Sequence, residues 1–232
     1  MGIYLSGGQN SAATSAELWG RFISEARTHD GEDTTVAVLA AGPEAVAAAE
    51  AIIAEAEKHG QARFIAVTCQ GSFGLPDIAS ATALVVADGP VAALRAALAP
   101  LEGEIRRRVS GDAPYFGIGA GARVAAEKMI VGGHLIGGVP VCPAAAAAGL
   151  DEVTVEQGLG LLDLSIEIAP AAEGVLGRLV AATEGTLIEG GVGIDHDTAL
   201  VIADGKLEVV GSGSLWQAIA SEYGVSVSTR GA

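Results

Sequence analysis

Short apolar runs alternate with longer segments of helical character along the first half of the chain. Residues 35–39, 63–68 and 83–87 are largely apolar or β-branched and show no polar alternation. Residues 2–5 and 115–118 have the same character. Continuous apolar runs of this length are typical of strands that a parallel sheet buries on both faces. The pattern therefore predicts five strands of a mostly parallel sheet.

Helical segments are predicted between these strands. Residues 44–58 are rich in alanine and follow a Gly-Pro turn, and residues 91–108 and 122–129 follow later strands. Strands that alternate with helices form parallel sheets with helices on both faces. We predict an α/β fold with three layers and a doubly wound, mostly parallel sheet.

The rhythm changes after about residue 130, where Gly-Gly pairs and Pro140 divide the chain into short pieces. Residues 172–183 are predicted to form one more helix. Residues 198–202 and 207–210 flank Asp204-Gly205, a pair that favours a two-residue hairpin turn. The last third is therefore expected to add antiparallel strands to the parallel core. No linker is apparent, so residues 1–232 are interpreted as a single domain.

Composition narrows the classes of protein that fit. The 232 residues are 50% hydrophobic and 18% charged, which excludes intrinsic disorder. The net charge of −15 argues against binding to nucleic acid or to an anionic membrane. No apolar segment is long enough to span a membrane. Cys69 and Cys142 are interpreted as reduced core residues, so a cytoplasmic location is expected.

The most informative segment is residues 115–122, which read Y-F-G-I-G-A-G-A. It is predicted to turn from a strand into a helix, at the sheet edge where open α/β proteins bind ligands. Three interpretations are open. Gly117, Gly119 and Ala122 fit a dinucleotide-binding loop, although no carboxylate follows at the required distance. The same glycines fit a nucleophile elbow with Gly119 at the central position. A tight turn without chemistry also fits.

Four motifs extend this pattern in a fixed order. Residues 117–122 match an elbow G-T-S-A-G-A without its serine, residues 158–162 read G-L-G-L-L, and residues 174–179 keep the pattern G-x-L-G-R-L. Residues 193–199 read G-I-D-H-D-T-A, close to G-I-D-E-x-T-A. In these motifs the chain resembles the cyanophycinase/dipeptidase E family of serine peptidases. The resemblance implies a class I glutamine-amidotransferase-like fold.

The same alignment shows where the chain departs from the family. The nucleophilic serine falls on Gly119, the general-base histidine on Ala169, and the glutamate that resembles the triad orienter on His196. Two arginines of the family fall on Glu173 and Val175. A turn that resembles part of the oxyanion site falls near Asp88-Gly89-Pro90. The resemblance therefore implies a peptidase framework whose triad positions have been replaced together.

These replacements predict a catalytically degenerate protein that acts in binding or assembly, as a homodimer or as a heterodimer with an active paralogue. A small peptide or a cationic molecule is the expected ligand. The pocket candidates are Asp88, Gly89, Ala120, Glu173, Arg178, Asp195, His196 and Thr198. No cofactor is expected, and no metal either, because Asp195, Asp197 and Asp204 lack the pattern of a calcium loop.

Two alternatives remain. The first is an active hydrolase of altered chemistry that uses His196 on a cyanophycin-like or β-aspartyl-peptide-like substrate, with His196 as a base, as a metal ligand together with His134, or as a ligand contact. Cys142 as a replacement nucleophile is disfavoured, since packing explains its position. The second, weaker alternative is a nucleotide-binding protein.

Overall fold

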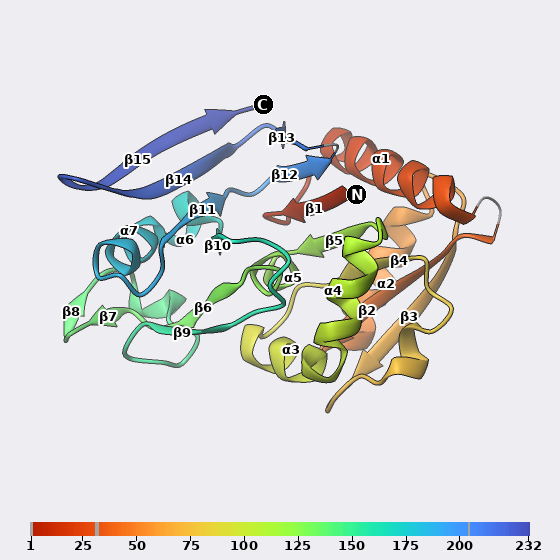
Figure 1. The fold of residues 1–232 in the computed structure, drawn as a ribbon, viewed down its shortest axis with the longest axis horizontal. Coiled ribbons are helices and arrows are strands. Elements are labelled where there is room, and N and C mark those ends of the chain that lie inside the picture. The colour runs from red at the N-terminus through yellow and green to blue at the C-terminus, as the bar shows by residue number, and fades with distance from the viewer. Residues whose placement is uncertain (1, 31–32, 204) are drawn as a thin grey trace.

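A seven-stranded sheet forms the centre of the computed structural model, which describes residues 2–30, 33–203 and 205–232 (Figure 1). Its order is β13-β12-β1-β5-β4-β2-β3. The parallel strands are β1 (Gly2–Ser6), β2 (Thr35–Ala41), β3 (Arg63–Cys69), β4 (Ala83–Val86) and β5 (Tyr115–Ile118). Strands β12 (Thr198–Ala203) and β13 (Lys206–Gly211) extend the sheet in antiparallel fashion from β1. The five predicted parallel strands are confirmed.

Helices cover both faces of this sheet, so the predicted three-layer architecture is confirmed. Helices α1 (Ala12–Asp30) and α2 (Ala45–Ala56) lie on one face, where Tyr4 and Phe116 of the sheet pack against Trp19 and Phe22 of α1. Helices α3 (Val91–Leu98) and α4 (Glu102–Ser110) lie on the other face, over a core that includes Ile3 and its neighbours. The side chains of β1 alternate between the two cores, as the pleat of a strand requires.

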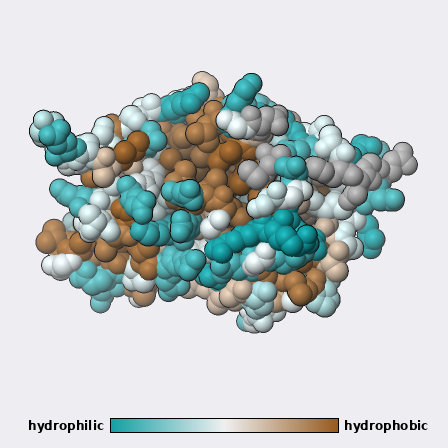
Figure 2. All heavy atoms as spheres, viewed as in Figure 1, coloured by the Kyte–Doolittle hydropathy of each residue, from teal (hydrophilic) through white to brown (hydrophobic). Residues whose placement is uncertain are grey.

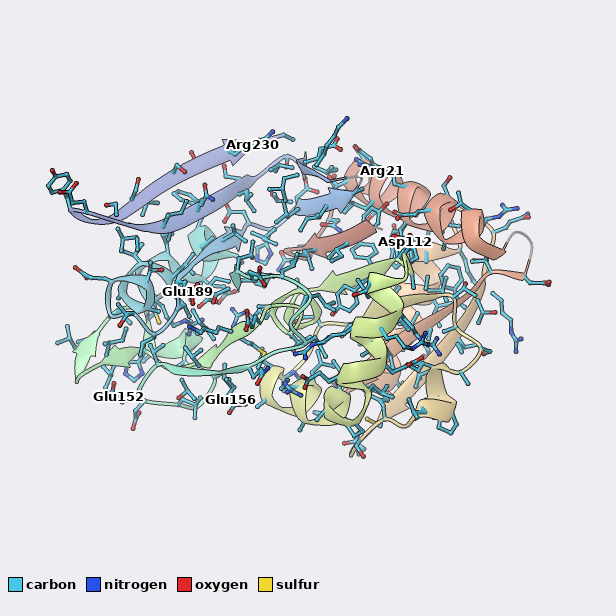
Figure 3. The ribbon with its side chains drawn as sticks, viewed as in Figure 1. Arg21, Asp112, Glu152, Glu156, Glu189 and Arg230 are labelled. Carbon is cyan, nitrogen blue, oxygen red and sulfur yellow. The ribbon has the colours of Figure 1, made fainter. Side chains whose placement is uncertain are left out.

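Polar contacts hold the helices at the surface of these cores. Arg21 of α1, labelled in Figure 3, pairs with Glu208 of β13 at 2.8 Å and links the sheet edge to this helix. The outer side of α4 forms a hydrophilic ridge (Figure 2), where Glu104 pairs with Arg107 and Arg108. No helix among the described residues is both long and apolar enough to cross a membrane.

Two predicted helices are each divided into two. The segment predicted as 91–108 contains α3, a 3-10 turn at Ala99–Leu101 and then α4. Pro100 lies in that turn, and a proline has no N–H to continue the helical ladder. The segment predicted as 172–183 contains α6 (Pro170–Glu173) and α7 (Leu176–Glu184). Gly174 separates them with a left-handed φ of 69°.

The predicted helix over 122–129 is wrong. Helix α5 covers only Ala120–Arg123, and strand β6 (Lys128–Gly132) begins soon after it. The carbonyls that would continue the helix bond to another segment instead: the Leu159 amide donates to Val124 and the Gly160 amide donates to Ala126. The G-L-G-L-L motif therefore ends α5 by taking its acceptors.

The last third forms a second sheet and small hairpins. The second sheet has the order β10-β11-β14-β15, with β10 and β11 parallel and the other pairs antiparallel. The bounds are β7 (Leu135–Ile136), β8 (Val139–Pro140), β9 (Thr154–Gln157), β10 (Ser165–Ile168), β11 (Gly190–Ile194), β14 (Ser214–Ser221) and β15 (Gly224–Gly231). Further 3-10 turns cover Leu75–Ile78 and Ala144–Ala146. In the predicted hairpin, Ala203 pairs with Lys206, while Asp204 lies outside the described residues.

Candidate functional site

A cavity of about 340 Å³ lies at the carboxyl ends of β1, β4 and β5. Parallel strands end at one edge of the sheet, so the loops that follow them meet there. Loops after β10 and β11 complete the wall. The lining residues that carry the argument are Gly7, Asp88, Gly89, Ala120, Arg123, Ala169, Glu173, Arg178 and His196. Pockets of this size accept small organic molecules.

The turn from β5 into α5 has the shape of a nucleophile elbow. Gly119 has φ 56° and ψ −115°, a backbone conformation that residues other than glycine rarely adopt. The Gly119 amide donates to the Ser6 carbonyl, which fixes the turn against β1. A Cβ atom at Gly121 would lie 2.0 Å from the Val86 carbonyl oxygen, so the helix begins too close to β4 for any side chain there. The glycine spacing thus serves a sharp turn in close contact with the sheet.

The carboxylate of Asp88 occupies the space in which a side chain at position 119 would begin. A Cβ atom on Gly119 would lie 2.3 Å from Asp88 Cγ. Asp88 Oδ1 accepts hydrogen bonds from the Ala120 amide at 2.8 Å and from the Gly89 amide at 2.9 Å. Two amides converging on one anionic oxygen resemble the arrangement that stabilises the oxyanion in acyl transfer. In this protein an internal carboxylate takes both donors.

This carboxylate also bears on the dinucleotide interpretation of the loop. A glycine-rich loop binds phosphate through free amides at the start of its helix. Here the Ala120 amide already donates to Asp88, and the negative charge of Asp88 would repel a phosphate. The geometry of the loop therefore disfavours nucleotide binding at this turn.

The two other positions that the resemblance assigns to a triad also reach the cavity. Ala169 is 1% exposed and has a left-handed φ of 50° directly before Pro170. His196 places Nδ1 3.2 Å from the Gly7 carbonyl oxygen. Among the described residues that line the cavity, none is Ser, Thr, Cys or Tyr. The described lining residues therefore offer no hydroxyl or thiol nucleophile to a molecule in this cavity.

The nearest candidates for a replacement nucleophile have other partners. The Ser6 hydroxyl donates to Asn10 Oδ1 and accepts from the Gly8 amide, both at 3.0 Å. The Cys142 thiol lies 3.5 Å from the Gly133 carbonyl oxygen, and burial raises its pKa. A thiol with a raised pKa is a weak nucleophile at neutral pH. Neither group contacts a base.

A charged cluster forms one wall of the cavity. The carboxylate of Glu167 is completely buried and accepts Nε and Nη2 of the equally buried Arg178 at 2.6 and 3.1 Å. Arg123 Nη2 reaches the same carboxylate at 2.8 Å. Although burial opposes it, the neighbouring Glu167 carboxylate raises the pKa of Arg178. The cluster therefore carries two positive charges and one negative charge.

Arg123 and Glu167 were not predicted from the sequence, whereas Arg178 was. The sequence contains one weak signal for each of Arg123 and Glu167. Arg123 stands two residues after Gly121, the last glycine of the elbow, and Glu167 is the one charged residue of the strand S-I-E-I. A charged residue in a buried strand requires a partner of opposite charge. Glu167 lies 44 residues after Arg123, and the sequence does not indicate that these two residues pair.

Two predicted pocket residues do not line the cavity. Asp195 accepts hydrogen bonds from Trp216 Nε1 at 2.7 Å and from the Ala171 amide at 3.2 Å. Thr198 is completely buried and donates to the His196 carbonyl at 3.1 Å. Both fix the loop that carries His196. His134 is likewise absent from the lining, and no group of three metal-ligating side chains lies together in the described part of the chain.

Asp197 anchors the same loop and should give the protein acid sensitivity. Partial burial opposes ionisation, but hydrogen bonds from Ser212 and Ser11 outweigh it and lower the Asp197 pKa from 3.8 to about 2. Because the folded pKa lies below the unfolded value, the carboxylate stabilises the fold above about pH 4, and this contribution is lost toward pH 2. Asp197→Asn should therefore lose less stability between pH 4 and pH 2 than the wild type, as measured by urea unfolding. Equal losses would contradict this assignment.

Comparisons with known proteins identify the fold. No family model and no curated protein sequence matches the chain. Among solved structures, a peptidase from an acI-B1 actinobacterium superposes with a TM-score of 0.66 and 15% identity, over 100% of this chain and 94% of that one. A candidate peptidase E from Listeria monocytogenes EGD-e superposes with a TM-score of 0.56 and 15% identity, over 91% of this chain and 98% of that one. The chain has the fold of these peptidases. The predicted class I glutamine-amidotransferase-like fold is thereby confirmed.

Proposed function

We propose that this protein is a catalytically degenerate relative of the cyanophycinase/dipeptidase E peptidases, and that it binds a small molecule in the cavity without hydrolysing it. One observation carries the proposal: the Asp88 carboxylate lies at the elbow, in the space of a nucleophile side chain and on the amides of Gly89 and Ala120.

The chemistry of acyl transfer explains why this matters. The reaction needs a nucleophile beside a base, the base held by a third group, and donors for the developing oxyanion. At the three corresponding positions the chain has Gly119, Ala169 and His196. Loss of the triad alone leaves a residual acceleration that depends on the oxyanion donors and on substrate binding. With a carboxylate on both donors, that residual contribution is removed as well.

Binding is supported by the cavity itself. It has the volume of a small-molecule site, and its lining carries charges of both signs. Asp88 and Glu173 are acidic, and Arg123 and Arg178 are basic. Such convergent polar groups orient a ligand within a pocket.

The purified protein should release no product above the buffer background from β-aspartyl dipeptides or from cyanophycin. Amino-acid release can be followed by chromatography over days at high protein concentration. Turnover that disappears in His196→Ala or in Cys142→Ala would overturn the proposal. Such a result would instead support a hydrolase of altered chemistry. His134→Ala is the control for His196→Ala, because His196 lines the cavity and His134 does not.

A further inference from the structure

The two arginines of the charged cluster differ in how many of their donors are used. Arg178 directs Nε and Nη2 to Glu167, and its Nη1 donates to the carbonyls of Gly133 at 3.0 Å and Ala146 at 2.8 Å. Its side chain is completely buried. Four of the five N–H donors of Arg178 are therefore used within the protein, and its role is to hold Glu167 and the neighbouring loops in position.

Arg123 keeps most of its hydrogen-bonding capacity. Among the described residues its guanidinium has one charged partner, Glu167, through Nη2 at 2.8 Å, and its side chain is 14% exposed on the cavity wall. A guanidinium has five N–H donors in a planar fork. The donors of Arg123 that do not reach Glu167 remain available on the cavity side.

The net charge of the cluster also favours an anionic ligand group. Arg123 and Arg178 together carry two positive charges against the single negative charge of Glu167, which leaves an excess of one positive charge beside the cavity. This excess positive charge attracts an anionic group of a ligand. A carboxylate suits the planar fork of an arginine best, through two parallel hydrogen bonds.

Two carboxylates also line the cavity. Asp88 uses Oδ1 for the amides of Gly89 and Ala120, while Oδ2 has no hydrogen-bond partner among the described residues. Glu173 lines the cavity too, with an exposed side chain. These carboxylates suit an ammonium group.

We infer that Arg123 is the carboxylate-binding residue of the cavity and that the ligand is a zwitterion of the size of an amino acid or dipeptide, with its ammonium group toward Asp88 and Glu173. This inference rests on the proposed function and specifies its ligand. It replaces the purely cationic ligand expected from Glu173 alone, since a cation without a carboxylate would leave unused the donors of Arg123 that do not reach Glu167. The cavity volume of about 340 Å³ fits a ligand of this size.

The first test changes the ligand. L-alanyl-L-alanine, its C-terminal amide and its N-acetyl derivative are titrated into the wild-type protein, and binding is followed by chemical-shift changes in NMR spectra. The dipeptide should bind best, and loss of either charge should weaken binding about tenfold or more, which corresponds to about 1.4 kcal/mol per step. If the amide binds as tightly as the dipeptide, or the dipeptide fails to bind at 10 mM (roughly the weakest affinity of interest), the inference is overturned.

The second test changes the protein. Arg123→Gln should reduce the affinity for the dipeptide to that of its amide and leave the affinity for the amide unchanged. Arg107→Gln is the matched control, because Arg107 pairs with Glu104 on the exposed side of α4 and does not line the cavity. Arg123→Lys keeps the charge but loses the fork, so it should bind with intermediate affinity, and it serves if Arg123→Gln does not fold. Unchanged dipeptide affinity in a folded Arg123 variant would overturn the inference. Free alanine in the same NMR spectra would instead overturn the proposed function.

Discussion

Serine at position 119 should destabilise the protein by about 2–5 kcal/mol and should create no peptidase activity. Two costs add. A side chain at φ 56° and ψ −115° is strained by about 1–3 kcal/mol. Its Cβ atom would also lie 2.3 Å from Asp88 Cγ, so the carboxylate must leave the two amides that hold it. Urea unfolding measures the free-energy change, and a dipeptidase assay on the same sample checks activity.

A double-mutant cycle separates the two costs of Gly119→Ser. Asp88→Ala removes the carboxylate, so Gly119→Ser should cost less in that background, with a coupling energy of about 1–3 kcal/mol. Gly121→Ser is the matched control, because its Cβ would meet the backbone carbonyl of Val86 at 2.0 Å, which Asp88→Ala does not relieve. If Gly119→Ser and Asp88→Ala prove additive to within about 0.5 kcal/mol, the carboxylate does not occupy that space.

This geometry also shows how far the sequence leads at the elbow. The spacing of Gly117, Gly119 and Gly121 indicated a sharp turn from strand to helix, and the structure has that turn. The alignment brought the segment at Asp88 to the same place. The sequence suggested a bare backbone at the bend. The structure instead has a carboxylate there, because glycine at 119 leaves room for the side chain of Asp88 from the loop after β4.

The parallel core was predictable because each strand is a continuous apolar run, and burial on both faces imposes that pattern. Two helix divisions were missed, although Pro100 and Gly174 stand at them and are residues that favour a break in a helix. The early end of α5 was not readable. The amides of Leu159 and Gly160 bond to the carbonyls of Val124 and Ala126, just after α5, and local propensity carries no information about such distant partners.

The charged cluster is the clearest case of this limit, and it also links the fold to the site. Glu167 lies on β10, Arg178 on α7 and Arg123 on α5, so the cluster joins the second sheet to the elbow helix. Arg178 donates to both carboxylate oxygens of Glu167. Arg123 is therefore held in place by a single ion pair and keeps donors for a ligand. The position of the ligand-facing residue therefore depends on a residue that does not need to touch the ligand.

Replacing Arg178 with methionine tests that dependence and should cost about 3–5 kcal/mol of stability. Methionine fills much of the volume, but Glu167 is left completely buried with Arg123 as its single charged partner. The buried Gly133 carbonyl and the partly buried Ala146 carbonyl lose their arginine donor as well. Buried acceptors that lose their donors carry the full cost of their desolvation. Urea unfolding at neutral pH measures the total.

Arg108 provides a control with a similar bonding pattern, one hydrogen bond fewer and less burial. Its Nε pairs with Glu104 at 2.6 Å, and its Nη1 donates to the carbonyls of Ile78 and Ala81, both at 2.7 Å. The side chains of Arg108 and Glu104 remain 16% and 19% exposed, so water can replace the lost bonds in Arg108→Met. This variant should therefore be clearly more stable than Arg178→Met. Equal losses would mean that the hydrogen bonds of the arginine, rather than the burial of Glu167, determine the loss of stability. The position of Arg123 would then not depend on the pairing of Glu167 with Arg178.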